Sequence, residues 1–155
     1  MTDCKILHYT DSIHYELEQT ARLMRILTLQ LFTKLGITIS LDEYCALDTI
    51  SINRQICQRD LAKLILKDRA NTTRILNELE KKEYITRIID TKNNRLVKKL
   101  EITQKGIDEL NSISIKIKSY IDNVTKKIAP EEVEKVQMIL KHFRLDLEKV
   151  VEMNI

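Results

Sequence analysis

Residues 58–81 read QRDLAKLILKDRANTTRILNELEK, and this stretch decides the fold because it predicts two short helices on either side of a polar break. In the first helix Leu61, Leu64 and Ile65 recur at i, i+3 and i+4, so one face is apolar. In the second helix the inward positions are taken by Ile75, Leu76 and Leu79. The outer face of that helix is polar and basic. Such a pair predicts a helix-turn-helix whose second helix enters the major groove of DNA.

A basic β-hairpin is predicted directly after these helices. Two β-rich runs, Tyr84 to Asp90 and Arg95 to Ile102, are joined by the turn-forming stretch Thr91-Lys92-Asn93-Asn94. A helix-turn-helix followed by such a hairpin is a winged helix. The predicted fold class is therefore mainly α with a small β-hairpin wing.

Basic charge is gathered in this same region. Residues 54–105 hold 14 Lys and Arg against 7 Asp and Glu, a net charge of +7, whereas the whole chain holds 26 against 23, a net charge of +3. The remaining residues are therefore mildly acidic. This distribution favours a polyanionic partner such as double-stranded DNA, with a solvated face that is basic by chance as the alternative.

Short motifs follow one another through this region in a fixed order. They are Leu61-Ala62, Thr73-Arg74, Leu79-Glu80-Lys81-Lys82, Ile85-x-Arg87, Asp90, Arg95 and Leu100-x-Ile102-Thr103-x-Lys105-Gly106. Their order and spacing resemble the MarR family of bacterial transcription regulators. The resemblance implies a repressor that responds to a small-molecule effector and binds DNA as a homodimer.

The chain departs from the family pattern at two places. Glu83 stands where the family usually has a glycine that closes the recognition helix, and Asn93-Asn94-Arg95 replaces the usual Asp-Arg-Arg at the wing tip. The aspartate of that triplet commonly steadies the arginine, so the wing geometry is expected to differ here.

Long amphipathic helices are predicted on both sides of the winged helix. Apolar residues recur every three to four positions from Asp11 to Leu35, and Gly36 ends that helix. Thr103 opens a second long helix, and Pro130 begins a third that runs to the C-terminus.

We therefore read residues 1–155 as a single domain with dimerisation helices at 10–36 and 103–152 and a winged-helix DNA-binding lobe at 40–102. At the start of that lobe Ser40 and Glu43 fit a capping box. A monomer that buries all of the apolar stripes internally is the alternative to a homodimer.

Side-chain chemistry assigns expected roles within the lobe. Asp68 is the expected N-cap of the recognition helix, Asn71 suits bidentate pairing with adenine, and Arg74 suits guanine or a phosphate. Arg95 on the wing suits insertion into a narrow minor groove. The predicted DNA-contacting residues are Gln58, Arg59, Arg69, Ala70, Asn71, Thr73, Arg74, Lys92, Arg95 and Lys98.

Some of these residues are expected to meet only the DNA backbone. Gln58 and Arg59 fit phosphate clamps, and Lys92, Lys98 and Lys99 add unspecific attraction. Arg87 has two open roles, a structural salt bridge or a DNA contact.

The effector site is not specified by any motif. Tyr9, His14, Arg22 and Tyr44 are candidate polar lining of a pocket, or ordinary helix and interface residues. A redox-sensing regulator of the same fold, using Cys4 or Cys57, is one alternative function, because Cys57 is flanked by Arg54 and Arg59. Cys45 is expected to be a small core residue.

Other function classes find little support. His8, His14 and His142 lack metal-ligand spacing, and neither a cofactor-binding motif nor a catalytic constellation suggests an enzyme. The absence of an apolar run near 18 residues, of a signal peptide and of a disulfide framework predicts a cytoplasmic protein that does not enter a membrane. A winged-helix protein-interaction module without DNA binding remains the alternative from another class.

Overall fold

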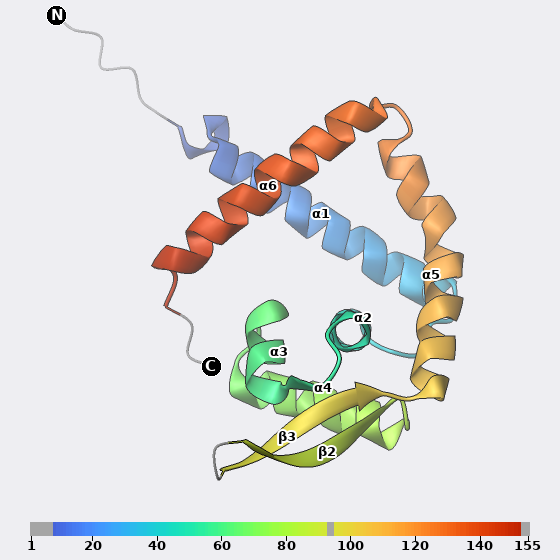
Figure 1. Cartoon of the computed structure of the whole chain (residues 1–155). Helices are drawn as coiled ribbons and strands as arrows, with labels where there is room; N and C mark the ends of the chain where they lie inside the picture. The colour runs from blue at the N-terminus through green and yellow to red at the C-terminus, as the bar shows by residue number, and fades with distance from the viewer. Residues whose placement is uncertain (1–7, 93–94, 153–155) are drawn as a thin grey trace, which may run out of the picture. The chain divides into compact units, whose positions relative to one another are not determined.

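The computed structural model describes residues 8–92 and 95–152, without the side chains of Lys92 and Arg95. The elements follow in the order η1 Tyr9–Asp11, α1 Ile13–Lys34, α2 Leu41–Ile52, β1 Ile56–Cys57, α3 Gln58–Leu64, α4 Arg69–Lys81, β2 Ile85–Lys92, β3 Arg95–Ile102, α5 Gln104–Thr125 and α6 Pro130–Val150 (Figure 1). The chain divides into two compact units, Met1–Leu41 and Asp42–Ile155, and each is described by itself.

The helix ends fall where capping residues were predicted. The Asp68 side chain caps α4 by accepting from the Asn71 N–H, and the Thr103 hydroxyl caps α5 by accepting from the Gly106 N–H. Pro130 is the first residue of α6. Gly36 follows the end of α1 with a φ of 64°, a left-handed conformation that glycine adopts without steric cost.

Left-handed residues also close the two helices of the helix-turn-helix, although neither is glycine. Leu66 has a φ of 53° after α3, and Glu83 has a φ of 63° after α4. At the second site the Glu83 N–H donates to the Glu80 carbonyl (2.9 Å) and the Tyr84 N–H donates to the Leu79 carbonyl (2.9 Å), which is a Schellman motif. The position that the family fills with glycine therefore keeps its conformation here with a side chain in place.

The sheet is three-stranded and antiparallel, in the order β1-β3-β2. The predicted hairpin is present, and its first strand begins one residue later and extends two residues further than expected. β2 and β3 pair from Ile85 opposite Ile102 to Lys92 opposite Arg95. The sequence reading missed β1, which pairs Ile56 with Leu100 and Cys57 with Lys99. This two-residue strand ties the start of α3 to the wing.

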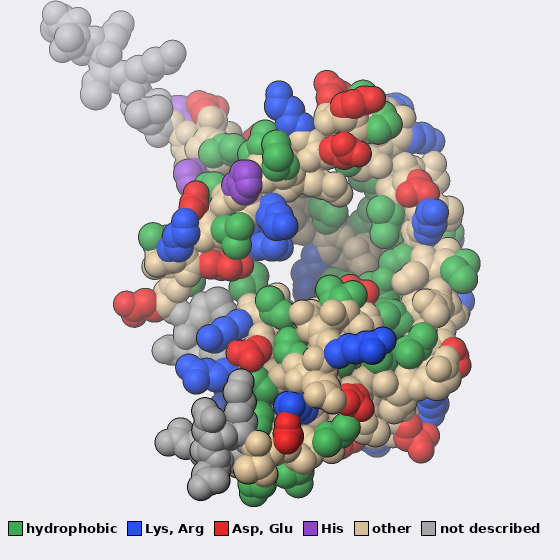
Figure 2. All heavy atoms as spheres, viewed as in Figure 1, with side chains coloured by type: hydrophobic (Ala, Val, Ile, Leu, Met, Phe, Trp, Pro, Cys, Tyr) green, Lys and Arg blue, Asp and Glu red, His purple; other side chains and the backbone are tan. Residues whose placement is uncertain are grey.

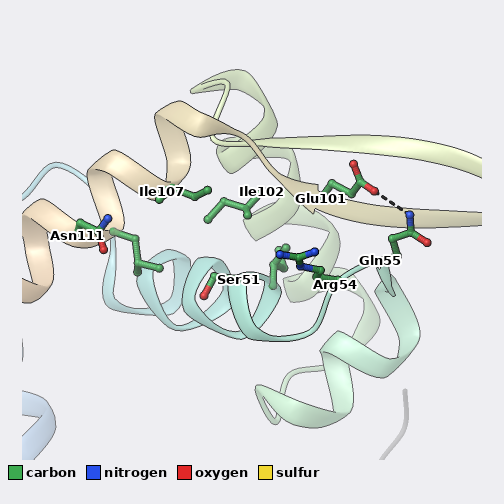
Figure 3. A pocket seen from close by; sticks show the side chains of 9 residues that line it. Ser51, Arg54, Gln55, Glu101, Ile102, Ile107 and Asn111 are labelled. Atoms are coloured by element: carbon green, nitrogen blue, oxygen red, sulfur yellow. Dashed lines mark hydrogen bonds between the residues drawn. The ribbon is translucent and has the colours of Figure 1, made fainter.

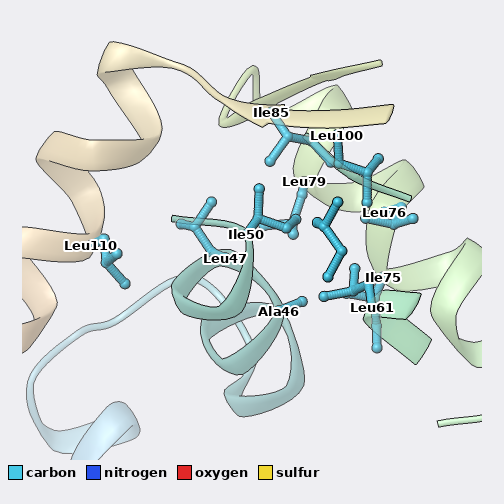
Figure 4. Packing of buried hydrophobic residues seen from close by; sticks show 11 residues of the cluster. Ala46, Leu47, Ile50, Leu61, Ile75, Leu76, Leu79, Ile85, Leu100 and Leu110 are labelled. Carbon is cyan, nitrogen blue, oxygen red and sulfur yellow. The ribbon is translucent and has the colours of Figure 1, made fainter. Parts of the chain in front are cut away.

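The core of the second unit lies among α2, α3, α4, α5 and the sheet. Its buried side chains converge on one another in Figure 4; they are Ala46, Leu47, Ile50, Ile56, Leu61, Ile75, Leu76, Leu79, Ile85, Leu100 and Leu110. Thr72 is also fully buried, and its hydroxyl is satisfied by donating to the Asp68 carbonyl (2.8 Å).

Two residues expected in the core are exposed instead. Leu64 is 58% exposed, because the buried face of α3 is centred on Leu61, Ala62 and Ile65, and a residue three positions after Leu61 lies at the rim of that face. Cys45 is also exposed, since α2 buries its neighbours Ala46 and Leu47.

Apolar residues reach the surface of the long helices. α5 buries Leu110, Ile113 and Ile117, but within the described chain the 21-residue α6 buries no residue. On α6 Val136, Met138 and Ile139 are each at least 50% exposed. On α1, described by itself, Leu23 is 65% and Met24 is 59% exposed. Figure 2 shows hydrophobic side chains at the surface among the charged ones.

Candidate nucleic-acid interface

The N-terminal end of α4 presents a polar and basic surface. We define the outer face of α4 as Arg69, Ala70, Asn71, Arg74 and Lys81, all of which are exposed. No acidic residue lies in the first turn of α4, and the carboxylate of its N-cap, Asp68, lies at the positive end of the helix dipole. The exposed guanidinium groups of Arg69 and Arg74 suit a phosphate backbone.

Asp68 fixes the start of this surface. Its carboxylate accepts from the Asn71 backbone N–H (2.8 Å) and from Asn71 Nδ2 (2.7 Å). The backbone hydrogen bond from Asn71, followed by the side-chain one, holds the pKa of Asp68 below its ordinary value. The Asn71 amide keeps its second N–H and its oxygen, and these are the donor and acceptor that adenine requires.

Two of the predicted DNA-contacting residues, Gln58 and Thr73, bond to each other. Gln58 Nε2 donates to Thr73 Oγ1 (2.8 Å), and Thr73 Oγ1 donates to the Arg69 carbonyl (2.8 Å). The proton of the Thr73 hydroxyl is therefore used within the protein. Arg59, which follows Gln58 at the start of α3, is exposed.

Arg87 is held by α4 at the base of the wing. Its Nη2 donates to Asn77 Oδ1 (2.7 Å), and its Nε lies 3.5 Å from Glu80 Oε2. The side chain is only 20% exposed. Of the two roles left open by the sequence, the structure shows the salt bridge.

The cations of the wing have different surroundings. Lys99 pairs with the Asp90 carboxylate, which neutralises part of the charge that was expected to attract DNA. Lys99 also lowers the pKa of Asp90 through this hydrogen bond. Lys98 is exposed. The side chains of Lys92 and Arg95, and residues Asn93 and Asn94, lie outside the described residues.

A pocket of about 650 Å³ lies beside the helix-turn-helix, within the second unit (Figure 3). Its apolar wall includes Ile50, Ile102 and Leu110, and Gln55 Nε2 donates to Glu101 Oε1 (3.0 Å) across one side. The remaining lining residues are Ser51, Arg54, Ile107 and Asn111. Sequence reasoning missed this pocket because its lining comes from three separate segments with no shared motif.

The four residues suggested as effector lining are found in other contacts. Tyr9 Oη donates to Glu18 Oε2 (3.0 Å), and Arg22 Nη2 donates to Glu18 Oε1 (2.5 Å), both within α1 and its preceding turn. Tyr44 Oη lies 3.3 Å from Ser114 Oγ, and His14 is exposed on α1. None of the four lines the pocket of Figure 3.

The remaining candidate chemistry concerns the cysteines, a metal site and a membrane-spanning helix. Cys57 Sγ donates to Asp60 Oδ2 (3.1 Å), and Cys4 lies outside the described residues. In the described part of the chain, no three His, Cys, Asp or Glu side chains gather as a metal site would need. A helix with the length and apolarity to cross a membrane is likewise not found among residues 8–92 and 95–152.

Comparison with known proteins gives consistent matches. The MarR family model matches residues 39–97. The chain is 28% identical over 116 residues to the HTH-type transcriptional regulator PapX of Escherichia coli, a match that covers 74% of this chain and 69% of PapX.

Solved structures of transcription regulators share the fold. The transcriptional regulator SlyA superposes with a TM-score of 0.74 at 22% identity, over 89% of this chain and 95% of that one. MarR superposes with a TM-score of 0.73 at 19% identity, over 94% and 97% of the two chains. MepR of S. aureus, in a structure of its DNA complex, gives 0.71 at 18% identity, over 90% and 99%. The predicted winged-helix fold class is confirmed.

Proposed function

We propose that this chain, which is similar to MarR-family winged helix-turn-helix transcription regulators over residues 39–97, binds a pseudo-palindromic operator as a homodimer and acts as a ligand-responsive repressor. The family and the fold are those of transcription regulators rather than of enzymes. Its place of action would be the cytoplasm, where bacterial operators lie.

The observation that carries the DNA-binding proposal is the outer face of α4. Its exposed Arg69 and Arg74 flank Asn71, and the Asp68 cap holds the Asn71 backbone in place. A helix that presents guanidinium and amide groups from its first turns has the donors and acceptors that read base edges in the major groove. The Gln58–Thr73 bond supports this surface by fixing α3 against α4.

The homodimer is supported by the uncovered apolar surface of the long helices. Within the described chain α6 buries no residue although it carries Val136, Met138 and Ile139 on its surface. Of the exposed apolar residues of α6, Val136, Ile139, Leu140, Leu147 and Val150 recur at helical spacing and so share one side of the helix. An exposed apolar face of this kind suits a protein interface. A second copy of the chain would cover it and would present two recognition helices roughly 34 Å apart, one turn of DNA. Light scattering on a gel-filtration column should give twice the mass of 18.2 kDa, and a monomer at micromolar concentration would contradict the dimer.

The effector proposal is supported by the pocket of Figure 3. Its volume of about 650 Å³ falls in the range of small-molecule sites, and it combines an apolar wall with the polar groups of Ser51, Arg54 and Asn111. A ligand there would contact the end of α2 and the start of α5, which flank the winged helix.

The test of the function is a binding titration. Fluorescence anisotropy would compare DNA from upstream of the protein's own coding sequence with a scrambled duplex over a series of salt concentrations. A preference of roughly 10³ or more supports a specific regulator. Equal binding to both duplexes would argue against a specific operator in that DNA. If neither duplex binds at low salt, DNA recognition is wrong and a protein-interaction module takes its place.

A further inference from the structure

Two neighbouring carboxylates at the start of α2 hold the two ends of the recognition helix. Asp42 Oδ2 lies 3.0 Å from Lys67 Nζ, and Lys67 directly precedes the Asp68 cap of α4. Glu43 Oε2 lies 2.8 Å from Lys82 Nζ, and Lys82 is the C-cap of α4. One turn of α2 is thereby tied to both ends of a 13-residue helix.

Every side chain of these two ion pairs is at most 30% exposed. The Glu43 side chain is 7% exposed and the Lys82 side chain 30%, whereas the Lys149–Asp146 pair is 73% and 72% exposed. The Asp42 and Lys67 side chains are 22% and 29% exposed. Solvent and salt screen exposed pairs strongly, so such pairs contribute little, but partly buried pairs are screened much less.

Polar contacts, among them the Gln58–Thr73 hydrogen bond, add to the apolar contacts that fix where α4 lies along its axis. Its buried face consists of Ile75, Leu76 and Leu79 together with the methyl-bearing Thr72, and apolar contact is not directional. Lys82 Nζ also donates a hydrogen bond to Glu43 Oε2 (2.8 Å), and a hydrogen bond has a preferred direction and a narrow distance range. A buried polar contact can for this reason select one packing register among several of similar apolar burial.

We propose that Asp42 and Glu43 are positioning residues for DNA recognition: through Lys67 and Lys82 they set the axial position of α4, and hence which base edges Asn71 and Arg74 reach. The inference rests on the proposed DNA-binding function. Neither carboxylate contacts DNA in this scheme, since each acts through its lysine at the end of the recognition helix.

Electrostatics and positioning predict opposite results when these carboxylates are neutralised. Asp42→Asn and Glu43→Gln each remove one negative charge from a lobe that binds a polyanion, so charge alone would tighten binding to any DNA. Loss of position would weaken binding only to the specific site, because phosphate contacts tolerate small shifts and bidentate base contacts do not. The sign of the change therefore separates the two explanations.

The experiment uses the full chain and two duplexes, one selected from a random pool by the wild-type protein and one with the same bases scrambled. For the double variant Asp42→Asn/Glu43→Gln, we expect the Kd for the selected duplex to rise about tenfold, the sort of loss a single mismatched base pair causes. The Kd for the scrambled duplex should stay the same or fall. Asp48→Asn removes one exposed carboxylate from the same helix and is the matched control; it should not weaken either complex.

A second experiment tests whether exchanging the two charges of the Glu43–Lys82 pair restores DNA binding. The exchange Glu43→Lys with Lys82→Glu keeps the net charge and restores an ion pair of opposite polarity, so it should bind the selected duplex better than either single reversal. Titrations are made well below each variant's melting temperature, because first-turn carboxylates also stabilise α2 through its dipole.

Three outcomes would overturn the inference. Tighter binding of the double variant to both duplexes would assign the carboxylates an electrostatic role only. Equal weakening on both duplexes would point to a general loss of structure. If the wild-type chain selects no sequence from the pool, the proposed function itself fails and the inference fails with it, which distinguishes that case from the first two.

Discussion

Gln58 Nε2 donates to Thr73 Oγ1 at 2.8 Å and so joins the first residue of α3 to the middle of α4. The two residues lie 15 positions apart, on the two helices that form the helix-turn-helix. The bond gives both polar side chains a partner within the helix-turn-helix.

A double-mutant cycle should detect this bond. Gln58→Ala and Thr73→Val each remove one partner, and we expect a coupling energy of about 0.5–1.5 kcal/mol in the free energy of unfolding measured with urea. A coupling near zero would mean that the bond is not maintained in solution. Arg59→Ala, which removes an exposed neighbour of Gln58, is the control and should not couple with Thr73→Val.

Glu83→Gly should stabilise the protein. Glu83 has a φ of 63°, and a left-handed conformation is costly for any residue with a Cβ. Its ion pair with Lys105 is exposed on both sides and contributes little in return. We expect the melting temperature to rise by about 2–6 °C in a calorimetric scan. As a control, Glu78→Gly places a glycine inside α4 and should lower the melting temperature.

Gly106→Ala should destabilise the junction between the wing and α5. A Cβ at Gly106 would lie 2.3 Å from the carbonyl oxygen of Tyr84, which is backbone and already accepts from the Thr103 N–H. Overpacking of this kind typically costs about 1–3 kcal/mol of folding free energy. Urea unfolding checks the value, with the exposed Gln104→Ala as control. An unchanged midpoint would show that the backbone of Tyr84 can move aside.

The stability that the Asp68 cap contributes to the folded protein should depend on pH. Hydrogen bonds from Asn71 lower the pKa of Asp68 in the folded chain below its ordinary 3.8. Asp68 therefore contributes stability that is fully present above about pH 4 and is lost as the pH falls through the folded pKa. The melting temperature of wild type should exceed that of Asp68→Ala at pH 7, and the difference should shrink below pH 4. A difference that is constant down to pH 2.5 would contradict the ionised cap.

Arg74→Ala should weaken DNA binding. Arg74 is exposed on the outer face of α4, where a guanidinium suits guanine or a phosphate. We expect a loss of about 1–3 kcal/mol in binding free energy. The salt series distinguishes the two contacts: a phosphate contact lowers the slope of log K against log salt by about 1 and affects all sequences, whereas a base contact relaxes specificity at one position. Wild-type affinity for every duplex would remove Arg74 from the interface.

Local chemistry made much of this fold predictable. Helix starts could be predicted at Asp68 and Thr103, whose side chains accept backbone N–H groups, and at Pro130, which has no N–H of its own. These capping rules involve only neighbours in the sequence. The hairpin likewise follows from two β-rich runs and one turn. Leu64 shows the limit of the approach, because in a seven-residue helix the apolar spacing fits more than one face.

Contacts between distant segments were not predictable in the same way. Glu43 fits a capping box by its spacing from Ser40, yet its carboxylate also reaches Lys82, which lies 39 residues further on. The guanidinium group of Arg87 suited a DNA contact and a salt bridge equally well. The salt bridge became evident only from the packing of the wing against Asn77 and Glu80. Such pairings depend on how the helices are packed, which side-chain chemistry alone does not determine.

The two-residue strand β1 has a mechanical consequence for any DNA that the protein reads. Because Ile56 and Cys57 pair with Leu100 and Lys99, the entrance to the helix-turn-helix and the returning strand of the wing are parts of one sheet. In the proposed DNA complex, the helix-turn-helix and the wing would therefore contact the DNA at a fixed separation. If both elements contact DNA as proposed, one base pair inserted between the two contacted segments would rotate one segment by roughly 34–36° relative to the other, given 10–10.5 base pairs per turn. We would then expect one of the two contacts to be lost.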